Sequence, residues 1–277
     1  MEERIVLGEP SWTNHSAHHV ARYLVAAEYV VGRRVLDAGC GIGYGTALLK
    51  AAGAAEVAGV DIDSESLALA EKQFGGDAIT FLQDDCQELG KLSGPFDVIC
   101  SFENIEHLPH PERFLRRAGQ LLADGGVLLI STPDRLIMRP FVDGRPRNQY
   151  HFHEWYRDEF RQLLTAAFRR VDMRAQVESV AYGSRQQAVE ALRQGLLWSN
   201  PLLMFLWRKW PLMHKADRPW KRLAGLAAPT IADYPVVPLA VAPIHGSPWC
   251  HFAICRQPEP TCRTDCPSVR QNSQHVQ

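Results

Sequence analysis

The sequence predicts an α/β protein built on a doubly wound parallel sheet. Three observations lead to this prediction. Short apolar strands alternate with amphipathic helices over residues 17–177. A glycine-rich turn at residues 39–45 joins the first strand to a helix. Acidic residues follow the ends of the later strands, and ligands bind at that edge of an open parallel sheet.

Length and composition place the chain among ordinary globular proteins. Its 277 residues suffice for one large α/β domain with an insertion, or for two domains at most. Hydrophobic residues make up 46% and charged residues 22%, which provides a full core. The formal net charge of −1 gives no general preference for nucleic acid or an acidic membrane. We expect a cytoplasmic protein, because the sequence shows no signal-peptide pattern and no apolar run of the ~18 residues that span a membrane.

The N-terminal elements are predicted from apolar spacing. Residues 1–15 are mixed in character and are expected to form an arm. Residues 17–31 carry apolar side chains at intervals of three and four, which predicts an amphipathic helix that Gly32 ends. A buried strand then begins near Arg34 and leads into the glycine-rich turn.

The following strands and helices are bounded by turn residues. Pro95 precedes one strand, Pro111 opens a helix at the position where its missing N–H costs nothing, and Gly125 stops that helix. The predicted strands lie at residues 56–61, 78–82, 96–101, 127–131, 170–177 and 249–256. The predicted helices lie at residues 64–74, 111–122 and 156–168.

These elements divide the chain into five segments. An N-terminal arm and helix (1–31) precede the ligand-binding core (32–177). A helical insert rich in aromatic and basic residues (178–248) separates this core from its last strand (249–256). Residues 257–277 are expected to be a disordered tail, because prolines there lie among polar residues.

The turn after the first strand has the pattern D-x-G-x-G-x-G, from Asp37 to Gly43. It does not fit the dinucleotide pattern G-x-G-x-x-G, because Tyr44 or Thr46 stands where the third glycine is required. It does not fit the phosphate-binding pattern G-x-x-x-x-G-K-[ST] either, because Thr46 follows Gly45. Asp37 would repel a pyrophosphate but would help to hold a cationic ligand.

This pattern resembles the first motif of the class I methyltransferases that depend on S-adenosylmethionine (SAM). That cofactor carries an ammonium and a sulfonium group and no phosphate. The resemblance implies a Rossmann-like sheet of seven strands in the order 3-2-1-4-5-7-6, with the last strand antiparallel beside the fifth. More similar overall is a group of bacterial methyltransferases associated with glycan assembly, which shares the pattern H-x-x-R-Y-x-x-A at residues 19–26.

The expected cofactor contacts follow the strand ends. Asp61 follows the glycine turn at about the 20-residue distance expected for an acid that accepts hydrogen bonds from a ribose, whereas Asp63 fits better as the N-cap of the next helix. The resemblance places the adenine amino group at an acid just past the third strand, either Asp85 or Asp84. The predicted cofactor-binding residues are Asp37, Gly39, Gly41, Gly43, Asp61, Ile62, Asp85, Cys86 and Phe102.

A second cluster of chemically active residues follows the fourth strand. Glu103, Glu106 and His107 are spaced i, i+3, i+4 and would share one face of a helical turn. The segment E-x-x-E-H is similar to one in the ubiquinone-pathway O-methyltransferases and the Hen-type small-RNA 2′-O-methyltransferases. In both families, these residues are associated with a divalent metal, and His151 occupies the place of a further histidine of the Hen-type family. This resemblance implies a metal site, such as a Mg²⁺ site, at Glu103, Glu106, His107 and His151.

Three interpretations of His107 and His151 stay open. They bind a metal together with Glu103 and Glu106, or they act as a general base without metal, or they are structural. The candidate catalytic residues are therefore His107, His151 and Glu103, while His153 is expected to face away by alternation.

The insert departs from the family pattern. Between residues 198 and 222, four tryptophans are interleaved with six basic residues and one acid. A helical lid over the substrate pocket is the first interpretation. Contact with a membrane surface or a lipid-linked substrate is the second, and nucleic-acid binding is not expected.

The sequence thus predicts methyl transfer from SAM by in-line displacement, in which the protein positions the acceptor and removes one proton. The first choice is O-methylation of a small molecule or of a glycan or lipid-linked precursor. RNA 2′-O-methylation and SAM binding without catalysis are the alternatives.

Overall fold

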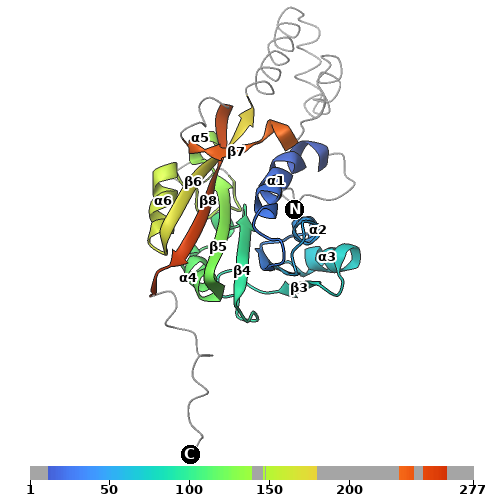
Figure 1. Cartoon of the computed structure of the whole chain (residues 1–277). Helices are drawn as coiled ribbons and strands as arrows, with labels where there is room; N and C mark the ends of the chain where they lie inside the picture. Colours follow the sequence, from blue (N-terminus) through green and yellow to red (C-terminus); the bar gives the residue numbers. More distant parts are fainter. Residues whose placement is uncertain (1–11, 139–145, 147, 180–230, 240–245, 261–277) are drawn as a thin grey trace, which may run out of the picture.

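The computed structural model describes residues 12–138, 146, 148–179, 231–239 and 246–260. Its centre is a twisted sheet of eight strands in the order β3-β2-β1-β4-β5-β8-β6-β7 (Figure 1). The strands are β1 (Arg34–Ala38), β2 (Glu56–Asp61), β3 (Ile79–Gln83), β4 (Phe96–Phe102), β5 (Leu122–Pro133), β6 (Phe168–Ser179), β7 (Val236–Pro238) and β8 (Gly246–Pro258).

The strand pairing confirms the predicted α/β class. Strands β3, β2, β1, β4 and β5 run parallel, so their carboxyl ends meet at one edge. β8 is antiparallel to both β5 and β6, as expected for the last strand of the core. β8 extends to Pro258, two residues into the predicted tail.

The prediction of seven strands was wrong by one short edge strand. β7 lies inside the segment assigned to the helical insert and pairs antiparallel with β6. It has three residues, of which only Val237 is buried, so it shows no alternating pattern that would mark it in the sequence. Most of the insert, including residues 198–222, lies outside the described residues.

Helices cover both faces of the sheet. They are α1 (Trp12–Ala27), α2 (Tyr44–Ala51), α3 (Ser64–Phe74), α4 (Pro111–Leu121), α5 (Arg135–Met138) and α6 (Arg157–Thr165), with 3₁₀ turns η1 (Ile105–His107) and η2 (Ile231–Asp233). α1 and α2 pack on one face, whereas α4 and α6 pack on the other. In β1, Val35 packs in the apolar core beneath α1 and α2, and Leu36 packs in the core beneath α4 and α6. Such alternation is typical of a strand that is buried on both faces. None of the helices described here is long and apolar enough to cross a membrane.

Several helix boundaries differ from the prediction. α1 begins at Trp12 rather than residue 17, and α6 ends at Thr165 rather than residue 168, where β6 already begins. α1 ends at Ala27 rather than near residue 31, but Val30 beyond it is fully buried, so the apolar spacing continues past the helix. α4 ends at Leu121, and Leu122 already pairs with Phe96 as the first residue of β5.

α1 is fixed against the glycine turn by one aromatic side chain. The Tyr23 hydroxyl donates to Asp37 Oδ1 at 3.1 Å, at the end of β1. A Cβ added at Gly45, in the first turn of α2, would overlap the Tyr23 ring. This contact explains why a helical position carries glycine despite the cost to the helix.

We predict that Gly45→Ala lowers the free energy of unfolding by about 1–3 kcal/mol, because relief of the overlap must move Tyr23 away from Asp37. Urea unfolding measures this loss. Gly76→Ala is the matched control, since an added Cβ there meets nothing within 4 Å, and its effect should stay within about 0.5 kcal/mol. Equal stability of the two variants would contradict the prediction.

Candidate active site

The glycine turn combines tight packing with one open position. Gly39, Gly41 and Gly43 have φ values of 81°, 52° and 80°, a region that favours glycine. An added Cβ would lie 2.6 Å from Asn104 Cγ at Gly39 and 2.7 Å from Phe81 Cζ at Gly43. At Gly41 it would meet nothing within 4 Å. Gly39 and Gly43 therefore serve packing, and Gly41 borders the space where a ligand can lie on the backbone.

Asp61 is held beside this turn in an orientation suited to a diol. Its Oδ2 accepts a hydrogen bond from Gly41 N at 2.8 Å, and its Oδ1 accepts one from Asp63 N at 2.9 Å. A carboxylate oxygen can accept more than one hydrogen bond, so both oxygens retain capacity for ribose hydroxyls. Asp63 caps α3 by accepting from Ser66 N at 2.8 Å, as the sequence predicts. The exposed side chain of Ile62 adds an apolar surface next to Asp61.

The residues after β3 are held by their own loop. Asp85 Oδ1 accepts from Gln87 N at 2.8 Å, and Asp84 Oδ2 accepts from Lys91 N at 2.8 Å. Both carboxylates remain partly exposed, so an adenine contact from either residue stays a prediction. Cys86 is buried, and burial raises the pKa of its thiol to about 12, which keeps the thiol protonated.

Two predicted cofactor residues turn toward the core. The Phe102 ring is buried between Tyr23 and Phe252, with centroids 5.0 and 5.7 Å away, so only its backbone lies at the sheet edge. Asp37 is fully buried and accepts from Tyr23 and from Thr46 Oγ1, the latter at 2.8 Å. Its carboxylate therefore links the end of β1 to α1 and α2 on either side of the glycine turn. Direct contact of Asp37 with the cofactor stays a prediction.

The second cluster forms where η1 meets the loop before α6. One possible metal-ligand atom from each of Glu106, His107 and His151 lies within 4.8 Å of those of the other two. Two backbone hydrogen bonds hold the segments together, from Phe152 N and His153 N to Glu106 O at 2.8 and 3.3 Å. We call Glu106, His107 and His151 the Glu–His–His cluster.

Each member of the cluster is oriented by a second group. His107 Nδ1 lies 3.0 Å from Tyr150 O, and His151 Nδ1 lies 3.0 Å from Glu154 Oε1. Thr132 Oγ1 donates to Glu106 Oε2 at 3.0 Å.

The cluster fits a divalent cation. Glu106 Oε1 is buried and has no hydrogen-bond partner among the described residues. Burial and then the charge of Glu103 raise the pKa of Glu106 to about 8. A cation between a carboxylate and two imidazoles would satisfy this oxygen and favour its ionised form.

Glu103 lies apart from the cluster, so the predicted set of four ligands is not brought together. Its Oε1 pairs with Arg22 Nη1 at 3.4 Å and accepts from Ser131 Oγ at 3.2 Å. The expected shared helical face does not form, because Glu103 has a φ of 53° and the helical turn covers only Ile105–His107. His153 also lies apart: its ring stacks on Trp155, and its Nε2 lies 3.1 Å from Pro109 O.

Several site residues were missed by sequence reasoning. Arg22 is fully buried and donates from Nε to Gln176 Oε1 at 2.8 Å, across 154 positions of the chain. The pattern H-x-x-R-Y contained Arg22 and Tyr23 but gave no partner for either. The pair Glu154-Trp155 served to align His151 with the Hen-type family, but neither Glu154 nor Thr132 was given a role of its own.

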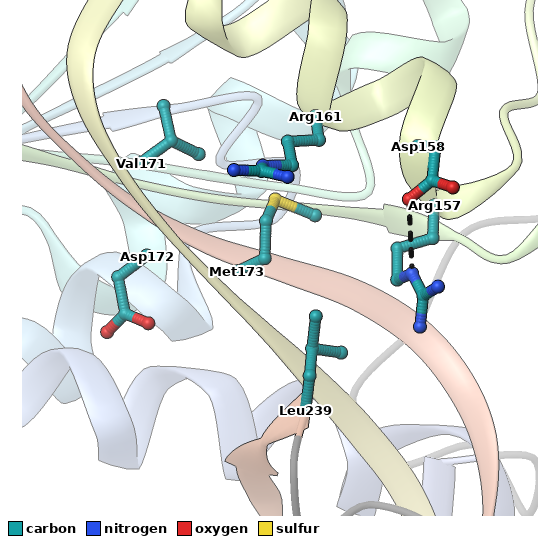
Figure 2. Close-up of a pocket in the computed structure, with 7 residues that line it drawn as sticks. All are labelled: Arg157, Asp158, Arg161, Val171, Asp172, Met173 and Leu239. Atoms are coloured by element: carbon teal, nitrogen blue, oxygen red, sulfur yellow. Dashed lines mark hydrogen bonds and ion pairs between the residues drawn. The ribbon is translucent and has the colours of Figure 1, made fainter.

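A separate pocket of about 390 Å³ lies between α6, β6 and the residue after β7 (Figure 2). Arg157 and Arg161 line it from α6, and Met173 and Leu239 line it from the opposite side. Arg157 is already paired with Asp158 at 3.4 Å. No residue of the glycine turn or of the Glu–His–His cluster lines this pocket, so we place the active site at the sheet edge instead.

Comparison with known proteins decides the family. Residues 15–175, more than half of the chain, match the family described as "Methyltransferase domain". The chain belongs to the SAM-dependent methyltransferases. This methyltransferase is 31% identical over 222 residues to a "Probable S-adenosylmethionine-dependent methyltransferase" of Mycobacterium tuberculosis, covering 79% of the chain and 75% of that relative. Its fold is similar to that of a Haemonchus contortus phosphoethanolamine N-methyltransferase, with a TM-score of 0.55, 17% identity and coverage of 86% and 53% of the two chains.

A second relative matches a shorter part of this methyltransferase. The ubiquinone biosynthesis O-methyltransferase of Nitrosococcus oceani is 37% identical over 109 residues, which cover 38% of this chain and 46% of that relative. The family identifies SAM as the cofactor, and the glycine turn with Asp61 is the part of the sheet edge that suits it.

We predict that Asp61→Ala weakens binding of S-adenosylhomocysteine, the product of SAM, by a factor of ten or more, because the ribose loses its acceptor. Isothermal titration calorimetry measures the change. Asp63→Ala is the matched control: it removes the cap of α3 and costs about 1 kcal/mol of stability, but it should leave affinity within about threefold. Unchanged affinity in Asp61→Ala would contradict this assignment.

A pH dependence of stability follows from Asp37. Burial raises its pKa from 3.8 to about 6, so the folded protein holds this proton more tightly than the unfolded chain. The free energy of unfolding should therefore fall as pH rises from about 4 to about 7, by on the order of 1 kcal/mol between pH 5 and 7.5. Asp37→Asn cannot ionise, so its decline in urea unfolding between the two pH values should be smaller than that of the wild-type protein by this amount, while the raised pKa of Glu106 contributes to the decline of both proteins. An identical decline in both proteins would show that another group causes it.

Proposed function

We propose that this methyltransferase transfers the methyl group of SAM to a hydroxyl oxygen, with a divalent cation held by the Glu–His–His cluster. The acceptor class we favour is a small molecule, or a glycan or lipid-linked precursor. The observation that carries the proposal is the cluster itself: one carboxylate and two imidazoles meet within 4.8 Å, beside the strand end that borders the glycine turn.

The reaction requires one proton to leave the acceptor. As the oxygen attacks the methyl carbon, an O–C bond forms and the S–C bond breaks, so S-adenosylhomocysteine departs and the hydroxyl proton must be taken up. A sugar or phenol hydroxyl is a weak nucleophile near neutral pH. A cation at the cluster would supply Lewis-acid chemistry that lowers the pKa of this hydroxyl.

The residues of the chain supply binding and orientation. Gly41 leaves space for the cofactor and Asp61 offers its oxygens to the ribose. Glu106, His107 and His151 would hold the cation, and Thr132 holds the Glu106 carboxylate in place. Imidazoles are more typical ligands of Mn²⁺ or Zn²⁺ than of Mg²⁺. We therefore consider Mn²⁺ as well as the Mg²⁺ that the family resemblance implies.

Oxygen as the accepting atom is supported by one relative. The Nitrosococcus protein is named an O-methyltransferase, and its match covers 38% of the chain. A peripheral membrane contact through residues 198–222 is part of the same proposal for a lipid-linked acceptor. Those residues lie outside the described part of the chain, so this part rests on their basic and aromatic composition alone.

A panel of acceptors tests the proposal. Phenols, sugars, lipid-linked sugars and short RNAs are incubated with labelled SAM, after EDTA treatment and with added Mn²⁺ or Mg²⁺. We expect transfer to a hydroxyl compound that EDTA abolishes and a metal restores. Metal-independent turnover, or turnover only on amines, would overturn the proposal, and metal-dependent transfer only to RNA would replace the proposed acceptor class.

Variants of the cluster should separate catalysis from cofactor binding. We predict that Glu106→Gln, His107→Ala and His151→Ala each lower kcat at least about 100-fold, while affinity for S-adenosylhomocysteine stays within about threefold. His153→Ala is the control, because this neighbouring ring lies apart from the cluster. Full activity in the His151 variant would contradict the assigned site.

A further inference from the structure

Glu154 is a buried carboxylate with one described hydrogen-bond partner. Its Oε1 lies 3.0 Å from His151 Nδ1, and both side chains are only 3% exposed. A buried charge is costly unless it is paired and hydrogen-bonded. The buried Glu154 carboxylate therefore contacts Nδ1 of an imidazole that belongs to the Glu–His–His cluster.

This contact determines where the imidazole carries its proton. If Glu154 is ionised, its carboxylate can only accept hydrogen bonds, and Nδ1 of a neutral His151 is then the protonated nitrogen. The lone pair then lies on Nε2, and only a nitrogen with a lone pair can coordinate a cation.

The second histidine of the cluster is held in the same way by a weaker partner. His107 Nδ1 lies 3.0 Å from Tyr150 O, and a carbonyl oxygen also only accepts. Both rings are thus oriented through Nδ1, but a carboxylate polarises its imidazole more strongly than a neutral carbonyl does.

The backbone around Glu154 is fixed on both sides. Arg135 N donates to Trp155 O at 3.1 Å, and Asp134 forms a parallel bridge with Trp155. On the other side, Phe152 N bonds Glu106 O. Because the backbone on both sides of Glu154 is hydrogen-bonded, we infer that the Glu154 carboxylate determines the orientation of the His151 ring.

We propose that Glu154 is a positioning residue, which holds the proton of His151 on Nδ1 and so presents Nε2 to a divalent cation. The part that concerns the cation rests on the proposed function. The part that concerns the tautomer does not, and it can be tested on the metal-free protein.

The tautomer is measured first. Long-range ¹H–¹⁵N NMR on protein labelled at its histidine rings distinguishes a protonated Nδ1 from a protonated Nε2. We expect His151 to be the Nδ1–H tautomer in the wild-type protein and to shift toward Nε2–H in Glu154→Leu, which removes the acceptor. An unchanged His151 tautomer in Glu154→Leu would overturn the proposal.

Cation affinity is measured next, by Mn²⁺ electron paramagnetic resonance with S-adenosylhomocysteine bound. We expect the Mn²⁺ Kd to rise about 10–100-fold in Glu154→Leu and less in Glu154→Gln, whose amide oxygen can still accept from Nδ1. The matched control is Glu112→Gln, which alters an exposed carboxylate 3.6 Å from His110 Nδ1 and should leave the Mn²⁺ Kd unchanged.

The outcomes separate the two proposals. Retained binding of S-adenosylhomocysteine shows that a variant is folded, and if Glu154→Leu fails this check, Glu154→Ala, which also removes the acceptor, takes its place in both measurements. Wild-type Mn²⁺ affinity together with an unchanged His151 tautomer, in a folded variant that lacks the acceptor, would overturn the positioning role. If the wild-type protein binds no Mn²⁺, the cation in the proposed function fails, and the tautomer shift alone decides the role of Glu154.

Discussion

The buried carboxylate of Asp37 joins three segments on which the cofactor site depends. It lies at the end of β1 and accepts hydrogen bonds from Tyr23 of α1 and from Thr46 of α2. Because a buried carboxylate requires these donors, the packing of α1 is coupled to the position of the glycine turn. The absence of a side chain at Gly45 lets Tyr23 reach this carboxylate. An N-terminal helix that sequence alone would leave as a peripheral element is therefore part of the cofactor-binding structure.

The two acids after β4 have different partners. Glu103 turns toward α1 and pairs with the buried Arg22, whereas Glu106 turns toward the loop before α6 and joins the two histidines. Between them the backbone turns, since Glu103 has a φ of 53° and the 3₁₀ turn begins only at Ile105. The end of β4 thus lies between the region suited to the cofactor and the region suited to an acceptor.

The sequence predicted what depends on local patterns. Alternating strands, the glycine turn, the cap at Asp63 and the strand-end acids all follow from short-range spacing, and the structure has them. β7 could not be predicted, because three residues are too few to show a period. The end of α1 was predicted too late in the chain, because Val30 packs in the core although it lies beyond the helix. The partners of Arg22 and Asp37 come from other elements of the fold, and no spacing rule links a residue to a partner such as Gln176. His151 was found by resemblance, but its pairing with Glu154 appears only when the loop is folded.

The position of β8 in the sheet has a consequence for biosynthesis. β8 fills the place between β5 and β6, and it is contributed by residues 246–258, long after both neighbours have been made. Until it emerges from the ribosome, β5 and β6 each present an unpaired edge in the middle of the future sheet. Such edges invite pairing with other chains, and non-local pairing of this kind forms slowly. The nascent chain is therefore most exposed to aggregation while the segment between β6 and β8 is being synthesised, and folding is completed only when the last strand is inserted.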